Sequence, residues 1–223
     1  MDDDIKKHVS KTGTTTVGVV CKDGIVLAGD RKITLGNGES IAYISPRNED
    51  KVVFVTDNLL VSTAGNASDL QRLVKLVRAE LRLRELKTGQ KSSVKDSANL
   101  FTNIVYQSIR NPSVIVSITH FLIAGYDDTG AYMYEVGADG TLTSVEEWRS
   151  TGSGMMQADP ILDLEHKKDI TLEEGIDLVK KCVNASRKRD PASGEGIDAY
   201  VIKKGEIKRV LKQKLVSEFR DRE

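Results

Sequence analysis

The hydrophobic residues of the chain change period along the sequence, and the order of these changes limits the fold more than any other feature. Runs of β-branched and apolar residues predict strands, whereas apolar residues three or four positions apart predict helices. The predicted order is four strands, two helices, strands, two helices and strands. Helices that come in consecutive pairs do not fit the strict alternation of a doubly wound parallel sheet. We therefore expect an α+β fold in one domain, a four-layer αββα sandwich of two antiparallel sheets flanked by helix pairs.

Turn and capping residues set the expected boundaries of these elements. Strands are expected at 14–21, 25–29, 51–55, 59–64, 120–126, 131–136, 197–202 and 207–211. The polar stretch 30–50 predicts a loop with one short strand at 40–44. Helix boundaries are indicated by Ser68 or Asp69 before the first helix and Gly89 after it, Asn111-Pro112 after the second, Gly152-Ser153-Gly154 before the third, and a capping box of Thr171 and Glu174 at the fourth.

Composition excludes several classes of function. Lysine plus arginine equals aspartate plus glutamate, at 33 each, whereas a protein that neutralises phosphates shows a basic excess, so no nucleic-acid partner is expected. Two cysteines cannot form a disulfide framework or a four-ligand zinc site. No apolar run approaches the roughly 20 residues of a membrane span, and the acidic N-terminus is not a secretory signal. We expect a cytoplasmic chain without a membrane partner.

The common catalytic motifs are absent from the sequence. It contains no phosphate-binding loop, no C-x-x-C, no H-E-x-x-H and no G-x-S-x-G. Metal catalysis has no ligand cluster to use, so we expect neither a metal nor a cofactor.

A junction between a polar leader and the first strand offers another chemistry. Thr14 follows Gly13, which has no side chain to crowd the carbonyl between them. If the chain were cut before Thr14, the freed α-amine would have a pKa of about 8 and would lie beside the Thr14 hydroxyl. One residue would then supply both nucleophile and base. The junction alone favours an ordinary strand that begins with threonines.

Several separated motifs decide between these two interpretations. From Thr14 onward, the sequence resembles the β-subunit of the proteasome core particle, of the N-terminal-nucleophile threonine protease family, and the short leader resembles the archaeal type. The α-subunits of that particle have a different N-terminal helix and no exposed threonine. The motifs, in the family's order, are Thr-Thr-Thr-Val-Gly at 14–18, Ala28-Gly29-Asp30-Arg31, Ser62-Thr63-Ala64-Gly65, Ser150-Thr151-Gly152-Ser153-Gly154, Thr171-Leu-Glu-Glu-Gly175 and Arg189-Asp190-Pro-Ala-Ser193-Gly194.

The resemblance implies a role for each matching residue. Residues 1–13 would be a propeptide that autocatalysis removes between Gly13 and Thr14, and residues 14–223 the hydrolase domain. The implied catalytic roles are nucleophile for Thr14, holder of a catalytic lysine for Asp30, oxyanion donor for Gly65, and orientation of the Thr14 amine and its water for Ser153, Asp190 and Ser193. The backbones of Thr34 and Ala67 would pair with an extended peptide. Taken singly, each of these residues could also be an ordinary turn or surface residue.

The position of the catalytic lysine is not set by the motifs alone, because the segment between Asp30 and Lys51 is longer than in the family. We assign Lys51, which immediately precedes the apolar run 52–55 as the family's lysine does. Lys32 and Arg47 are the rivals, and Arg47 is the weaker one because an arginine stays protonated and cannot relay a proton. The pocket for the residue before the cleaved bond is expected at Ile33, Val53 and Thr63, which would suit apolar side chains.

The resemblance implies a threonine endopeptidase that degrades unfolded proteins to short peptides inside a closed barrel. Its partners would be α-subunits and other β-subunits in stacked seven-membered rings, and an ATP-dependent unfoldase that acts through the α-ring. The main alternative is a structural subunit of the β-ring with the same fold and no activity. A second alternative is an amidohydrolase of the same nucleophile class that acts on small amides as an isolated chain.

Overall fold

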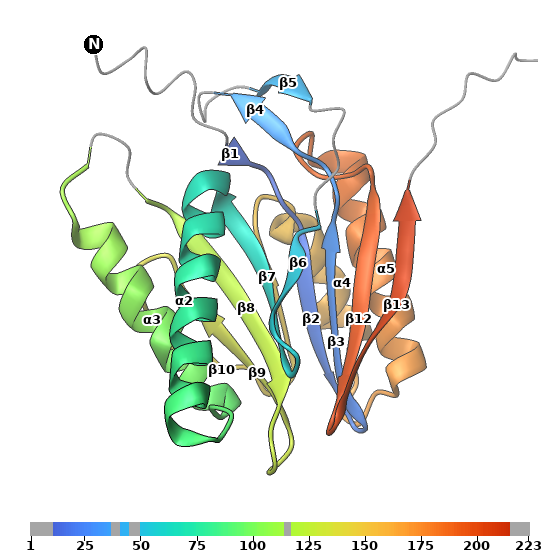
Figure 1. The fold of residues 1–223 in the computed structure, drawn as a ribbon. Coiled ribbons are helices and arrows are strands. Elements are labelled where there is room, and N and C mark those ends of the chain that lie inside the picture. The colour runs from blue at the N-terminus through green and yellow to red at the C-terminus, as the bar shows by residue number, and fades with distance from the viewer. Residues whose placement is uncertain (1–10, 37–40, 45–49, 114–116, 215–223) are drawn as a thin grey trace, which may run out of the picture.

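Two antiparallel sheets lie face to face in the centre of the molecule, and a pair of helices covers each outer face (Figure 1). This computed structural model describes residues 11–36, 41–44, 50–113 and 117–214. The predicted four-layer αββα sandwich is therefore confirmed.

Each sheet is built mainly from hairpins. The first has the order β1-β7-β8-β9-β10, with β6 also paired to β7, and comprises β1 (Lys11–Thr12), β6 (Val52–Thr56), β7 (Leu59–Asn66), β8 (Thr119–Tyr126), β9 (Ala131–Val136) and β10 (Leu142–Ser144). The second has the order β11-β2-β3-β12-β13 and comprises β2 (Thr16–Cys21), β3 (Gly24–Asp30), β11 (Trp148–Thr151), β12 (Gly196–Lys203) and β13 (Glu206–Lys214). A separate hairpin pairs β4 (Thr34–Gly36) with β5 (Ile41–Ile44).

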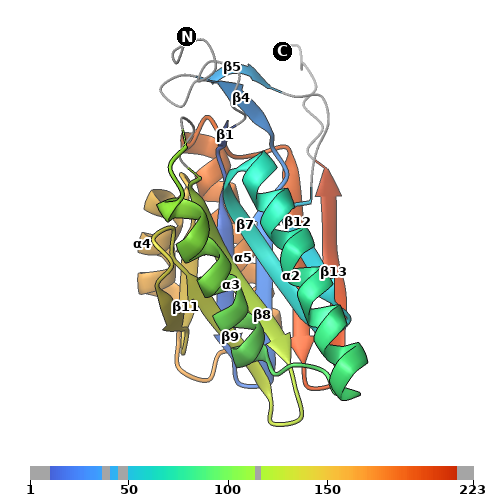
Figure 2. The same ribbon diagram turned by 60° about the vertical axis from the view of Figure 1, so that its left-hand side comes forward.

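The helices form the outer layers. They are α2 (Ala67–Thr88) and α3 (Val94–Arg110) on the first sheet, and α4 (Met155–Glu165) and α5 (Leu172–Arg189) on the second (Figure 2). The capping box that predicted α5 is confirmed, because the Thr171 hydroxyl accepts a hydrogen bond from the Glu174 N–H and the Glu174 carboxylate accepts one from the Thr171 N–H.

Three buried clusters alternate with the four layers. One lies between α2, α3 and the first sheet around Phe101 and Phe121, and one lies between α4, α5 and the second sheet around Val179 and Cys182. The third fills the space between the two sheets and contains Ile25, Leu27, Val52, Leu60, Leu122, Ala124, Met133, Val145, Tyr200 and Ile202. Because strands such as β3 and β7 are covered on both faces, they are nearly continuous in apolar residues, as the sequence indicated.

Some boundaries differ from the prediction. Helix α2 starts earlier than expected: its N-cap is Asn66, not Ser68 or Asp69. The cause is that β7 runs directly into the helix, so no loop separates them. Strand β2 begins at Thr16, two residues after the predicted start. The predicted short strand at 40–44 is β5, of which residue 40 lies outside the described part of the chain.

Four short strands were not predicted. Strands β1, β4, β10 and β11 have two to four residues each, too few for a periodic pattern to show. Strand β1 matters most, because it places part of the polar leader in the first sheet.

We predict that both cysteines are inert to thiol reagents in the folded chain. Burial raises the pKa of Cys21 and of Cys182 to about 12. At pH 8 the thiolate fraction is then about 10⁻⁴ instead of about one tenth, so alkylation by iodoacetamide should be about a thousandfold slower than for free cysteine. Mass spectrometry of the native chain should detect no adduct, and the urea-unfolded chain should carry two. Rapid labelling of the native chain would contradict this packing.

Candidate active site

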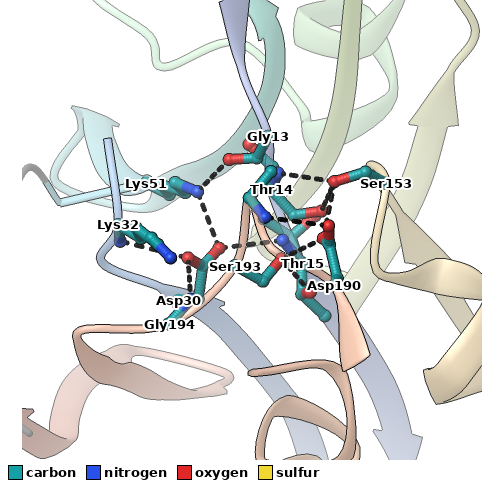
Figure 3. A network of polar contacts seen from close by, with 12 residues as sticks. Gly13, Thr14, Thr15, Asp30, Lys32, Lys51, Ser153, Asp190, Ser193 and Gly194 are labelled. Carbon is teal, nitrogen blue, oxygen red and sulfur yellow. Dashed lines mark hydrogen bonds and ion pairs between the residues drawn. The ribbon is translucent and has the colours of Figure 1, made fainter. Parts of the chain in front are cut away.

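Several elements end at one edge of the sandwich and bring the predicted site residues together (Figure 3). Thr14 precedes β2, Asp30 ends β3, and Lys51 precedes β6. Ser153 lies just before α4, and Asp190 is the C-cap of α5. The register Thr16 with Gly29 and Ile197 with Asp30 fixes the order of three neighbouring strands at this edge.

Asp30 is the centre of a buried hydrogen-bond network. Its Oδ1 accepts from Lys51 Nζ at 2.7 Å and from the Thr15 N–H at 2.8 Å. Its Oδ2 accepts from the N–H groups of Lys32 and Gly194 at 3.0 and 2.9 Å. The side chain is fully buried. Four donors, one of them charged, satisfy an ionised carboxylate that has no access to water.

Lys51 is the cationic partner of Asp30. Its side chain is 5% exposed, and its Nζ also donates to the carbonyl oxygen of Gly13 at 2.5 Å. Burial lowers the pKa of Lys51 below the ordinary value, although the charges of Asp30 and Asp190 act in the opposite direction. An ammonium group in this position can stabilise negative charge on the Gly13 oxygen, and it releases a proton more readily than an exposed lysine does.

A second network holds the nitrogen of Thr14. The Thr14 N–H donates to Ser153 Oγ at 3.2 Å, and Ser153 Oγ donates to Asp190 Oδ2 at 2.6 Å. Ser193 Oγ donates to the same carboxylate oxygen at 2.6 Å and lies 2.7 Å from Thr15 Oγ1. The network therefore links the carboxylate of Asp190 through two hydroxyl groups to the first residues of the predicted mature chain.

The end of the leader lies in an extended conformation along β7. Strand β1 pairs with β7 so that Thr12 faces Gly65. The Gly13 N–H then donates to Oγ1 of Thr34, the first residue of β4, at 3.3 Å. The bond between Gly13 and Thr14 is thus held between Lys51 on the carbonyl side and Ser153 on the nitrogen side.

Two glycines allow the close contacts at this site. Gly65 has φ 128°, and a Cβ there would lie 2.1 Å from the carbonyl oxygen of Ile118. Gly152 has φ 91°, and a Cβ there would lie 2.1 Å from the carbonyl oxygen of Thr14. Any other residue would push the β7 edge or the loop before α4 away from the junction. Gly65 lies within β7, so it is not a turn glycine.

A cavity of about 580 Å³ opens beside Lys51. Ile33, Val53, Thr63 and Ala67, all predicted to contact a substrate, line this cavity, and Leu70 and Val74 of α2 add apolar surface. Thr34 does not line it but contacts Gly13.

The structure also separates the candidate lysines. Lys32 Nζ donates to the carbonyl oxygen of Pro191 at 2.6 Å, and only its backbone N–H contacts Asp30. Lys51 is the described lysine whose ammonium group contacts both Asp30 and Gly13. Arg47 lies outside the described residues.

Three contributors to the site were not predicted from the sequence. Thr15 joins the two networks through its N–H and its hydroxyl, Gly194 donates to Asp30, and β1 places the leader beside Gly65. The run of three threonines could have indicated Thr15, because its side chain must point away from that of its neighbours in an extended chain. Nothing in the sequence marks β1.

Comparison with known proteins assigns this chain to a family. A family model described as "Proteasome subunit" matches residues 10–202. A protein named "Proteasome subunit beta" from Methanosarcina barkeri is 38% identical over 200 residues, which cover 89% of this chain and 90% of that protein. The chain belongs to the proteasome β-subunit family. A "Proteasome subunit beta 1" from Thermococcus onnurineus is 39% identical over 190 residues, which cover 85% of this chain and 88% of that protein. A "Proteasome subunit beta" from Methanococcus aeolicus is 36% identical over 208 residues, which cover 93% of this chain and 91% of that protein.

The resemblance stated from the sequence motifs is thereby confirmed, and membership of the family implies assembly with other proteasome subunits. Within the described part of the chain, no three His, Cys, Asp or Glu residues are arranged to hold a metal ion. The described helices include none that is long and apolar enough to cross a membrane.

We predict that removing the Asp30 carboxylate destabilises the chain strongly. Asp30→Ala leaves the buried Lys51 ammonium without its partner and should lower the free energy of unfolding by about 3–5 kcal/mol. The double variant Asp30→Ala/Lys51→Met should recover part of this loss, because it leaves no unpaired charge. Glu80→Ala, which removes an exposed pair with Arg84, is the control and should change the value by less than about 1 kcal/mol. Urea unfolding followed by circular dichroism measures all three, and an Asp30→Ala effect as small as the control would contradict the assignment.

Proposed function

We propose that this chain is a threonine endopeptidase subunit of a proteasome core particle, activated by autocatalytic removal of residues 1–13. One observation carries the proposal: the Gly13 carbonyl oxygen contacts Lys51 Nζ, itself paired with buried Asp30, while the Thr14 nitrogen contacts Ser153. This is the arrangement needed to polarise the bond between residues 13 and 14 and to receive its nitrogen.

The leader would be removed in two steps. First, Thr14 Oγ attacks the Gly13 carbonyl carbon, and Lys51 stabilises the negative charge that develops on the carbonyl oxygen. The C–N bond breaks, the hydroxyl proton is transferred to the leaving nitrogen, and an ester joins Gly13 to Thr14. Water then hydrolyses the ester, which releases residues 1–13 and restores the hydroxyl group.

The free amine then gives Thr14 its own base. An α-amine has a pKa of about 8, and the nearby Lys51 charge lowers it further. The amine would stay near Ser153 Oγ, and Asp190 and Ser193 would orient it and a water molecule. For a peptide substrate, Thr14 Oγ attacks the carbonyl carbon and forms an acyl-enzyme. The amine, directly or through that water, takes the hydroxyl proton and passes it to the leaving amine of the first product. Water then hydrolyses the acyl-enzyme and releases the second product.

We propose that the substrate occupies the space that the leader leaves. The leader pairs with β7 at Gly65 and contacts Thr34 on its other side. An extended peptide could pair with the same two edges through the backbones of Thr34 and Ala67, with the Gly65 N–H serving as oxyanion donor. The side chain before the cleaved bond would enter the 580 Å³ cavity, where Ile33, Val53 and Thr63 suit an apolar residue.

The proposed setting follows from the family. The chain would form stacked seven-membered rings with α-subunits and other β-subunits in the cytoplasm, and an ATP-dependent unfoldase would feed unfolded polypeptides through the α-ring. The reaction needs no cofactor. The alternative of a structural ring subunit predicts assembly without leader removal, and that of a small-amide hydrolase predicts turnover by the isolated chain.

We predict that Thr14→Ala keeps the leader and abolishes activity. The substitution removes the nucleophile, so peptidase activity of particles assembled with the α-subunit should fall more than about a thousandfold. Thr14→Ser retains a hydroxyl group and should retain leader removal and measurable turnover. Intact mass and hydrolysis of a fluorogenic peptide measure both variants. Normal turnover by Thr14→Ala would exclude the threonine mechanism.

We also predict that the two candidate lysines differ. Lys51→Gln removes the ammonium group that contacts Gly13 and Asp30, so leader removal should slow at least about a hundredfold. Lys32→Gln removes an exposed contact with Pro191 and should leave the rate within about threefold of the parent. A time course of intact mass during assembly measures both. The opposite ranking would transfer the catalytic role to Lys32.

A further inference from the structure

The Asp30–Lys51 pair joins the two sheets of the sandwich. Asp30 ends β3 in the second sheet, whereas Lys51 precedes β6 in the first. The chain between them is long and contains the β4–β5 hairpin. Hydrogen bonds within either sheet therefore do not set the distance between these two side chains. Contacts between the two sheets hold the start of β6 against the end of β3, and the packing of Val52 in the buried cluster between the sheets is one of them.

Four charged residues outside the proposed catalytic set lie beside this pair. They form a closed ionic quartet of Arg31, Asp50, Asp198 and Arg209, in which each arginine contacts both carboxylates. Arg31 Nη1 lies 2.7 Å from Asp50 Oδ1 and also contacts Asp198 Oδ2. Arg209 Nη2 lies 3.0 Å from Asp50 Oδ2 and 2.7 Å from Asp198 Oδ1.

The positions of these residues in the chain matter as much as their contacts. Arg31 immediately follows Asp30, and Asp50 immediately precedes Lys51. Asp198 lies on β12 opposite Gly29, and Arg209 lies on β13. The quartet thus connects the two backbone positions next to the Asp30–Lys51 pair, and it fixes both to the edge of the second sheet.

The quartet is buried at the Asp198 end and partly exposed at the Asp50 end. The side chains of Asp198 and Arg31 are 1% and 12% exposed, and those of Arg209 and Asp50 are 27% and 38% exposed. The guanidinium carbon of Arg209 lies 5.3 Å from the centre of the Tyr200 ring, which restricts it further. Two positive and two negative charges balance, so loss of either carboxylate would leave an excess positive charge close to Lys51.

We propose that Asp198 and Arg209 are positioning residues that hold Lys51 in register with Asp30 and Thr14. This inference rests on the proposed function, and it adds two residues that contact neither the junction nor the Asp30–Lys51 pair through any hydrogen bond in the described structure. They act through Asp50 and Arg31, which they fix at the two ends of the segment 31–50.

The kinetic test compares matched variants in particles assembled with the α-subunit. Asp198→Asn and Arg209→Gln should lower kcat about 10- to 100-fold, the effect of a misplacement of about 1 Å. KM for a peptide with alanine before the cleaved bond should stay within about threefold, because neither Asp198 nor Arg209 lines the cavity, although Arg31 and Asp50 do. Arg209→Lys keeps the charge and should recover most of the activity.

Glu135→Gln is the matched control. Glu135 is a carboxylate that also contacts two basic residues, His120 and Arg149, and its side chain is 13% exposed, but it lies on β9 away from the quartet. A loss of kcat in Asp198→Asn together with recovery in Arg209→Lys supports positioning. An equal loss in Glu135→Gln, or an unchanged kcat in Asp198→Asn, overturns it.

A second measurement separates this inference from the proposed function. In a Thr14→Ala background, where no turnover is needed, a double-mutant cycle of Asp198→Asn and Lys51→Gln measures their coupling in urea unfolding. Positioning predicts that the two changes deviate from additivity by more than about threefold in the unfolding constant, although the side chains do not bond. Additive effects overturn the inference. A parent particle that lacks activity while the coupling is present would instead count against the proposed function alone.

Discussion

The buried ion pair between Asp30 and Lys51 is the interaction on which the site depends. It crosses from one sheet to the other, and three backbone N–H groups complete the coordination of its carboxylate. A pair without access to water is tolerated only when every donor and acceptor is satisfied, so the surrounding strands and loops have little freedom. The same constraint explains why Gly194 and Thr15 lie where they do.

The end of the leader lies in this site, where the proposed substrate would lie. Its last residues pair with β7 as strand β1, and they present the Gly13 carbonyl to Lys51 and the Thr14 nitrogen to Ser153. A peptide in an extended conformation along the same edge would place its own carbonyl group beside Thr14, where the Gly65 N–H is the proposed oxyanion donor. Leader removal and peptide hydrolysis would then be the same reaction at the same site. The free amine of Thr14 would be available only for peptide hydrolysis. Activity would therefore be limited to chains that have already folded around the junction.

Local patterns in the sequence predicted the layers, and the family resemblance implied most of the residues that the structure brings together at the junction. Paired helices implied the sandwich, and the motif order pointed to the residues around Thr14. What it missed depends on contacts between distant segments. Strand β1 has no periodicity of its own, Asn66 caps α2 because β7 continues into it, and the quartet joins Arg31 to Asp198 across 167 positions. The partner of a charged residue at a strand end cannot be predicted from the sequence, because only the fold brings the two residues together.

The central claim is that Thr14 becomes the N-terminus through the chain's own chemistry. The most direct test is the intact mass and N-terminal sequence of the unmodified chain after assembly with its α-subunit. We predict a single species that has lost residues 1–13 and begins at Thr14. The contradicting result is a chain that enters the particle and still carries Gly13 on Thr14, even when every other β-subunit of the same cell is present. That result would favour the structural role.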